Sequence, residues 1–171
     1  TKFLRGYGYQ GGASRAGFGR GVNTEGFGAD FKTALTKPGP WTFGFGGFGE
    51  VLPNPNNRMT LDPSQKDKWG IPLIVFDAAF GENELAQRKD IVETAKEMLD
   101  AAGFKNIEGY DRPVHIGLGI HEMGTARMGR DPKTSVLNAF NQVHACPNVF
   151  ATDGACMASS GCVNPSMTYM A

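Results

Sequence analysis

Residues 69–103, WGIPLIVFDAAFGENELAQRKDIVETAKEMLDAAG, contain the clearest strand and the clearest helix of the sequence. The continuous apolar run at residues 73–76 predicts a strand that is buried on both faces. Residues 84–102 predict an amphipathic helix, with Asn83 placed to cap it and Gly103 placed to end it. The helix is expected to pack on a sheet as scaffold, because its apolar positions share one face: Ile91, Ala95, Met98, Leu99 and Ala102.

The regions on either side extend this mixed α/β pattern. Residues 59–80 predict two strands around a polar connection. Residues 1–50 hold most of the 24 glycines, interleaved with aromatic residues, and predict loops and short strands. Downstream, the stretch VHIGLGI at residues 114–120 predicts a strand that leads to His121, and residues 148–152 predict a strand that leads to Asp153.

Composition excludes several classes of partner. The 17 Lys and Arg residues balance 17 Asp and Glu residues, so the long-range attraction that nucleic acid or an anionic membrane requires is missing. No run approaches the roughly 18 apolar residues of a membrane-spanning helix. At this length, one globular unit with a sizeable core is expected, burying roughly 70% of the unfolded surface. The missing initiator methionine predicts a fragment of a larger protein.

Three other patterns have a functional and a structural interpretation. Two stretches match the dinucleotide fingerprint GxGxxG, but no helix pattern follows either, so we interpret both as chance matches. The Arg-Gly-aromatic segments have too few arginines for a nucleic-acid site. A metal site built from His144 and the cysteines is conceivable, although small buried thiols are favoured. The glycines are Gly6, Gly8 and Gly11, and Gly44, Gly46 and Gly49; the cysteines are Cys146, Cys156 and Cys162.

Two segments contain residues that could take part in catalysis or cofactor binding. In IHEMGTARMG, residues 120–129, His121 ends a predicted strand before a polar, glycine-containing loop, where a histidine can accept a proton near neutral pH. A structural His121 is the alternative, and His115 and His144 are interpreted as structural. In FATDGACMASSGCVNPSMT, residues 150–168, Asn164 is placed to cap a helix whose N-terminus would attract an anionic cofactor, although Asn-Pro also opens purely structural helices.

Together these segments resemble the C-terminal region of the glucose-methanol-choline (GMC) family of FAD-dependent oxidoreductases, over roughly residues 50–171. The matching text is residues 121–129, 136–138, 147–154 and 164–168. The opening RGYGYQGG resembles the bacterial sugar and glucoside dehydrogenase branch of that family. That branch resemblance also admits a periplasmic location.

The resemblance implies a role for each matching residue. His121 takes the proton of the substrate hydroxyl while hydride passes to flavin N5, and Asn164 orients the alcohol oxygen by hydrogen bonding. Arg127 either adds to the positive field or forms a structural ion pair. No metal is implied. The positions that match cofactor contacts are Asp153, Gly154, Pro165, Met167 and Thr168.

The resemblance also implies an architecture and a reaction. Residues 1–128 match a substrate-binding domain, a mostly antiparallel sheet with flanking helices, and residues 129–171 match the return into a Rossmann-like FAD domain. The family's own GxGxxG for FAD is absent, so the chain alone is expected to bind FAD weakly and to be inactive. The implied reaction is oxidation of a CH-OH group of a sugar or glycoside, with an electron acceptor or a partner subunit. The alternatives are a non-catalytic carbohydrate-binding module with the same fold and an oxidase of a non-sugar alcohol.

Overall fold

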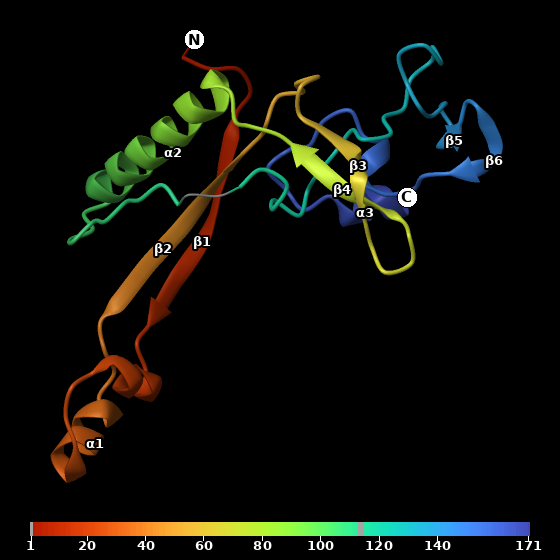
Figure 1. Cartoon of the computed structure of the whole chain (residues 1–171). Coiled ribbons are helices and arrows are strands. Elements are labelled where there is room, and N and C mark those ends of the chain that lie inside the picture. The colour runs from red at the N-terminus through yellow and green to blue at the C-terminus, as the bar shows by residue number, and fades with distance from the viewer. Residues whose placement is uncertain (1, 113–114) are drawn as a thin grey trace. The chain divides into compact units, whose positions relative to one another are not determined.

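The computed structural model describes residues 2–112 and 115–171. Its strands pair two by two, β1 with β2, β3 with β4, and β5 with β6, so the mixed α/β class is confirmed, but the described residues form no larger sheet. Residues 8–48 form a small unit and the rest of the chain a larger one; the predicted boundary at residue 128 stays a prediction. In chain order the elements are β1 (Tyr7–Arg15), the 3-10 helix η1 (Phe18–Asn23), α1 (Gly28–Thr36), β2 (Trp41–Gly49), β3 (Arg58–Lys66), β4 (Pro72–Asp77), α2 (Glu82–Ala101), β5 (Gln142–Val143), β6 (Cys146–Phe150), the 3-10 helix η2 (Gly154–Cys156) and α3 (Ser166–Met170) (Figure 1).

The glycine-rich N-terminal region forms two nine-residue strands and a helix. The GxGxxG glycines lie on or beside β1 and β2, so they are strand glycines; a Cβ at Gly11 would collide with the carbonyl oxygen of Gly44. Helix α1 was not predicted from the sequence. It is held by Arg20, whose guanidinium donates to the carbonyl oxygens of Ala34 and Lys37 at the C-terminal end of α1, at 2.9 and 2.7 Å.

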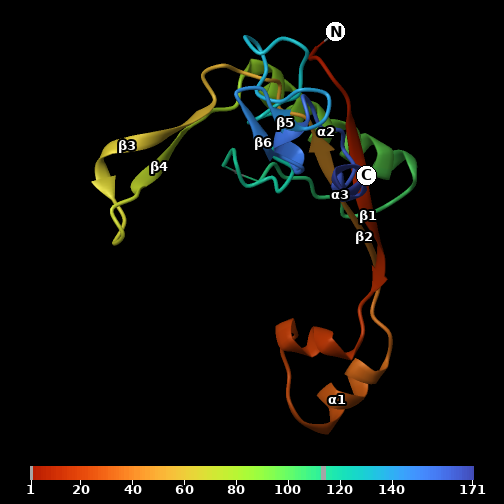
Figure 2. The same ribbon diagram turned by 90° about the vertical axis from the view of Figure 1, so that its right-hand side faces the viewer.

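Strands β3 and β4 form an antiparallel hairpin, and no third strand of the described residues pairs with it (Figure 2). Met59 pairs with Phe76 and Leu61 with Ile74, so the two predicted strands are confirmed. The prediction that residues 73–76 are buried on both faces is wrong for this chain, because Phe76 is 73% exposed and its three predecessors are also exposed. A two-stranded hairpin has two open faces, and the described residues cover neither.

Helix α2 begins two residues earlier than predicted. Gly81 is its N-cap residue, and the Glu84 carboxylate accepts the Gly81 amide at 2.7 Å. Asn83 is not the cap; its side-chain oxygen accepts the Leu4 amide at 2.7 Å. The predicted end of the helix is confirmed. Gly103 has φ +82°, and the amides of Gly103 and Phe104 donate to carbonyl oxygens of the last helical turn.

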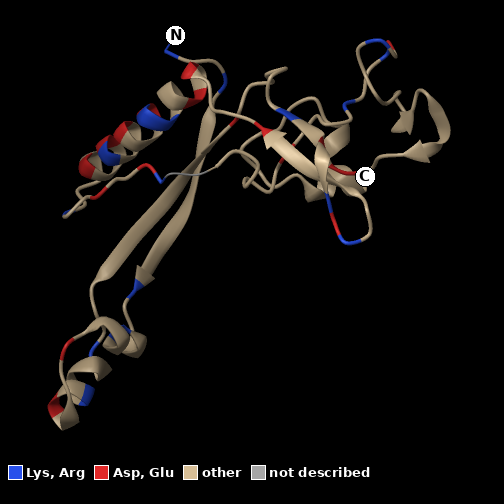
Figure 3. Ribbon diagram, viewed as in Figure 1, with Lys and Arg blue, Asp and Glu red and all other residues tan. Residues whose placement is uncertain are grey.

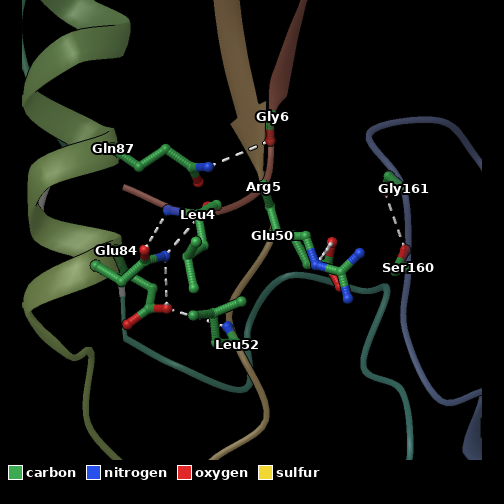
Figure 4. A network of polar contacts seen from close by, with 10 residues as sticks. Leu4, Arg5, Gly6, Glu50, Leu52, Glu84, Gln87, Ser160 and Gly161 are labelled. Carbon is green, nitrogen blue, oxygen red and sulfur yellow. Dashed lines mark hydrogen bonds and ion pairs between the residues drawn. The ribbon is translucent and has the colours of Figure 1, made fainter. Parts of the chain in front are cut away.

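The side chains that α2 buries are not those of its predicted apolar face, so the predicted packing of that face on a sheet is wrong. Its most buried side chains are polar, Glu84 at 7% and Gln87 at 3% exposure. Gln87 donates to the Gly6 carbonyl oxygen at 3.2 Å, and Glu84 accepts the Leu52 amide at 3.0 Å (Figure 4). Tyr7 donates to the Asp90 carboxylate one turn further along the helix. Polar contacts therefore anchor this helix to segments distant in sequence.

Charges of both signs are interspersed, as the exposed side of α2 shows (Figure 3). The bridge from Arg88 to Asp111, at 2.7 Å, joins α2 to the segment that follows it. No helix among residues 2–112 and 115–171 is long and apolar enough to cross a membrane.

Candidate functional site

His121 is presented by a loop, so the predicted strand before it is wrong for residues 115–120; Val114 lies outside the described residues. Ile120 has φ +69°, a left-handed conformation that is unfavourable for a β-branched residue. Directly after His121, the Glu122 carboxylate accepts the Gly119 amide at 2.7 Å. This bond closes a tight loop around His121.

The His121 side chain is half-buried, and no hydrogen bond reaches its ring from the part of the chain that the structure describes. His144 provides a contrast, because its Nε2 lies 3.1 Å from Ser135 Oγ and 3.2 Å from the Gly129 carbonyl oxygen. His144 is thus occupied in holding the loop of residues 129–135. His121 keeps its hydrogen-bonding capacity for another molecule.

The segment after His121 runs alongside η2. Three of its backbone amides, at every second residue, donate to three successive carbonyl oxygens of η2. The pairs are Gly124 to Gly154 at 3.3 Å, Ala126 to Ala155 at 3.0 Å and Met128 to Cys156 at 2.8 Å. The structure thereby brings the His121 loop against the predicted Asp153 turn.

The Asp153 turn follows β6, which confirms a strand close to the predicted residues 148–152. Asp153 accepts the Ala155 amide at 2.9 Å and so caps η2. Gly154 is buried, and a Cβ there would lie 2.8 Å from the Tyr169 hydroxyl, 2.9 Å from the Glu122 carbonyl oxygen and 3.0 Å from Met123 Sδ. The protein's own packing therefore requires glycine at this position.

Helix α3 begins at Ser166 with Pro165 as its N-cap residue, one residue later than predicted. Pro165 is buried and its carbonyl oxygen accepts the Thr168 amide at 2.9 Å. Asn164 consequently does not cap the helix. Its exposed side chain has no hydrogen bond within the described residues, and its amide stays available to a ligand.

Tyr169 ties α3 to the His121 loop. Its hydroxyl lies 3.4 Å from Met123 Sδ. Burial raises the pKa of Tyr169, as do the neighbouring charges of Asp153, Cys156 and Glu122, so the hydroxyl stays protonated and donates. No sequence signal singles out Tyr169, because a lone aromatic residue in a short helix fits many roles.

The loop of residues 127–137 is built around Leu137, which is fully buried. The Gly129 amide donates to the Leu137 carbonyl oxygen at 2.8 Å. Arg127, for which the sequence left two roles open, donates to the Thr134 carbonyl oxygen. In the described part of the chain Arg127 therefore forms no ion pair and closes this loop instead.

Exposed apolar side chains lie near the start of α3. Val163 and Met167 are 64% and 78% exposed, and Asn164 lies between them in sequence. Ligand sites combine apolar side chains with a few polar groups that fix orientation. The described residues contain no group of three or more His, Cys, Asp or Glu side chains arranged to hold a metal ion.

One family model and several known proteins match this chain. A family model described as GMC oxidoreductase matches residues 53–171. The 2-methyl-1,2-propanediol dehydrogenase of Mycolicibacterium austroafricanum is 38% identical over 71% of this chain and 22% of its own length. The paromamine 6'-oxidase of Streptomyces fradiae is 34% identical over 70% of this chain. The fructose dehydrogenase large subunit of Gluconobacter japonicus is 34% identical over 71%. The chain spans about a fifth of the length of these relatives.

Proposed function

Because the chain belongs to the GMC oxidoreductase family, we propose that it is the active-site part of an FAD-dependent enzyme that oxidises a CH-OH group. One observation carries the proposal: backbone hydrogen bonds bring the segment after His121 against the Asp153 turn, while no hydrogen bond from the described residues reaches the His121 ring. The names of the relatives, dehydrogenases and oxidases of a diol and of sugars, support the reaction class.

In the proposed mechanism His121 is the base. It accepts the hydroxyl proton of the substrate as the hydride leaves the carbinol carbon, a contribution of roughly 10²–10⁴ in rate for a positioned base. Asn164 donates its amide to the alcohol oxygen and orients it. An amide cannot take up a proton at neutral pH, so the proton transfer depends on His121 alone.

GMC proteins generally bind FAD, and this chain supplies part of the proposed site. FAD, when bound, supplies the acceptor of the hydride. The exposed apolar side chains on either side of Asn164 fit the flavin ring, and the residues proposed to lie along the cofactor are Asp153, Gly154, Pro165, Met167 and Thr168. The chain has no strand–GxGxxG–helix unit in its described residues, so the main grip on FAD is proposed to lie in the rest of the protein.

The proposed substrate is a sugar or glycoside. The relatives act, by their names, on 2-methyl-1,2-propanediol, paromamine, fructose, gluconate and pyranoses. Residues 1–128 are proposed to bind the substrate and residues 129–171 to return into the FAD domain. Because one relative is named as a large subunit, a partner subunit that receives electrons is part of the proposal.

The test uses the full-length protein that carries this chain. Purified protein with its flavin is assayed with an artificial electron acceptor on 2-methyl-1,2-propanediol, paromamine, D-fructose, D-gluconate and D-glucose. His121→Ala is expected to lower kcat by about 10²–10⁴. His115→Ala is the matched control, because His115 is exposed and has no proposed role. Undiminished turnover in His121→Ala would remove the base assignment.

Two further arms separate the alternatives. Oxygen consumption without the artificial acceptor would identify an oxidase. If the unmutated protein turns over none of the five compounds but binds one of them in calorimetry, a non-catalytic carbohydrate-binding module is favoured instead.

A further inference from the structure

Tyr169 lies where the three proposed site segments meet. It belongs to α3, which begins two residues after Asn164. Its hydroxyl contacts Met123, two residues after His121. The same hydroxyl occupies the space that a Cβ on Gly154 would need. One side chain thus contacts the segments of the proposed base, the proposed cofactor turn and the proposed orienting amide.

No second hydrogen bond shares this role in the part of the chain that the structure describes. The His121 loop and η2 are joined by three backbone bonds. Residues 166–170, by contrast, are joined to either segment by the Tyr169 hydroxyl only. Among the hydrogen bonds of the described residues, this contact alone links α3 to the His121 loop.

We infer that Tyr169 is a positioning residue that sets the spacing between His121 and Asn164 through its contact with Met123 and Gly154. The inference rests on the proposed function, because it assigns Tyr169 a part in that same site. Tyr169 does not touch the reacting atoms and acts only through the residues it holds in place. Base catalysis is sensitive to such placement, since a shift of about 1 Å can cost roughly 10²-fold in rate.

The physical character of the contact suits a spacer. A thioether is a weak acceptor, so the bond itself contributes little energy. The hydroxyl is instead one of three atoms, with the Glu122 carbonyl oxygen and Met123 Sδ, that crowd the position a Cβ on Gly154 would take. Removing it leaves a gap that the helix and the loop can close only by moving toward each other.

The first experiment compares Tyr169→Phe with the unmutated full-length protein on the best of the five test compounds, deuterated at the carbon that is oxidised. A mispositioned base slows the chemical step only, so kcat is expected to fall on the order of 10-fold, with KM little changed. The deuterium isotope effect on kcat is expected to rise, because hydride transfer then limits turnover more strongly. Tyr110→Phe, which removes the same hydroxyl from a residue that is 68% exposed, is expected to change neither value.

A structural role alone gives a different result. If Tyr169→Phe lowered only the folded fraction, activity would fall while KM and the isotope effect kept their original values, and the inference would be wrong. Hydrogen exchange provides a readout independent of turnover: amides of residues 124–128 are expected to exchange faster in Tyr169→Phe and not in Tyr110→Phe.

Gly154→Ala tests the geometry. Its added methyl group meets the Tyr169 hydroxyl first, so it is expected to cost less kcat in the Tyr169→Phe background than in the native one. A double variant whose loss equals the product of the two single losses would contradict the inference. If the unmutated protein oxidises none of the compounds, the proposed function fails and this inference with it; wild-type kinetics in Tyr169→Phe would overturn the inference alone.

Discussion

The backbone next to His121 is strained. Ile120 is 89% exposed and lies in the left-handed region, which costs a residue with a Cβ roughly 1–2 kcal/mol. Strain of this kind persists where the surroundings over-determine a conformation, and such residues cluster at functional sites. The bond from Gly119 to Glu122 supplies that constraint here.

Replacing Ile120 by glycine should separate stability from activity. Ile120→Gly is expected to raise the stability of the folded protein by about 1 kcal/mol, because glycine accepts this conformation without strain. Its kcat is expected to fall, because the freed loop holds His121 less firmly. Thermal unfolding and steady-state kinetics check both values, with Ile120→Val as the control that keeps the β-branch. A variant with unchanged kcat would show that the strain has no part in positioning His121.

At the level of single residues, His121 and Asp153 were candidates because each follows a predicted strand, and Asn164 because it precedes a predicted helix. It wrongly expected a strand before His121. Alternation of apolar residues with glycine fits a strand, but Gly117 adopts φ +87° and turns the chain. Contacts such as Tyr169 with Met123 join residues 46 positions apart, and no local pattern encodes them.

Among the elements, α2 depends on a buried carboxylate at its N-terminus. Burial acts to raise the pKa of Glu84, but the hydrogen bonds from the Leu52 and Gly81 amides and the Asn83 side chain together lower it below its ordinary value. A lowered folded-state pKa means that the ionised carboxylate stabilises the fold above the unfolded-state pKa. This stabilisation is lost as the pH falls through the folded-state value.

Glu84→Gln should therefore weaken the start of α2 at neutral pH. The side-chain NH2 group of the introduced glutamine would face the backbone N–H of Gly81 or of Leu52. That buried backbone donor would then lack an acceptor, at a cost of about 1–3 kcal/mol. Amides of the first turn are expected to exchange with deuterium about 5- to 150-fold faster. Glu82→Gln, an exposed change in the same turn, is the control. The difference from the native protein should shrink at acid pH; a constant difference would contradict the assigned role of the charge.

The elements also show where sequence prediction stops. The strand at residues 73–76 and the helix at residues 84–102 were predicted because an apolar run and a helical periodicity are local patterns. Their partners were not, since the helix buries Gln87 against Gly6 and, among the described residues, the strand has only β3 beside it. Helix α1 was missed because the residue that holds its C-terminal end, Arg20, lies outside the helix.

For the whole chain, the exposed surface is too large for an independent domain. It amounts to 13282 Å², whereas a compact protein of this mass exposes about 8,000 Å². A sizeable core was predicted because the composition shows how many apolar residues the chain has. Composition does not show whether the residues that cover these side chains belong to the same chain. The hairpin of β3 and β4 is the clearest case, because the face with the pairs Met59–Phe76 and Leu61–Ile74 is apolar and exposed.

The isolated chain should behave accordingly. We expect it to bind a hydrophobic fluorescent dye strongly and to retain little FAD, because the surfaces that cover its apolar residues and hold the cofactor lie elsewhere. The full-length protein serves as the control and should bind little dye. Flavin that co-purifies with the isolated chain at one mole per mole would contradict this expectation.

If His121 is the only base at this site, the rate of flavin bleaching in a single turnover depends on it. The full-length protein is mixed with its alcohol in the absence of oxygen, and the loss of flavin absorbance is followed. His121→Ala is expected to slow the bleaching by about 10²–10⁴, with flavin content and substrate binding retained. Bleaching at the native rate in that variant would contradict the account.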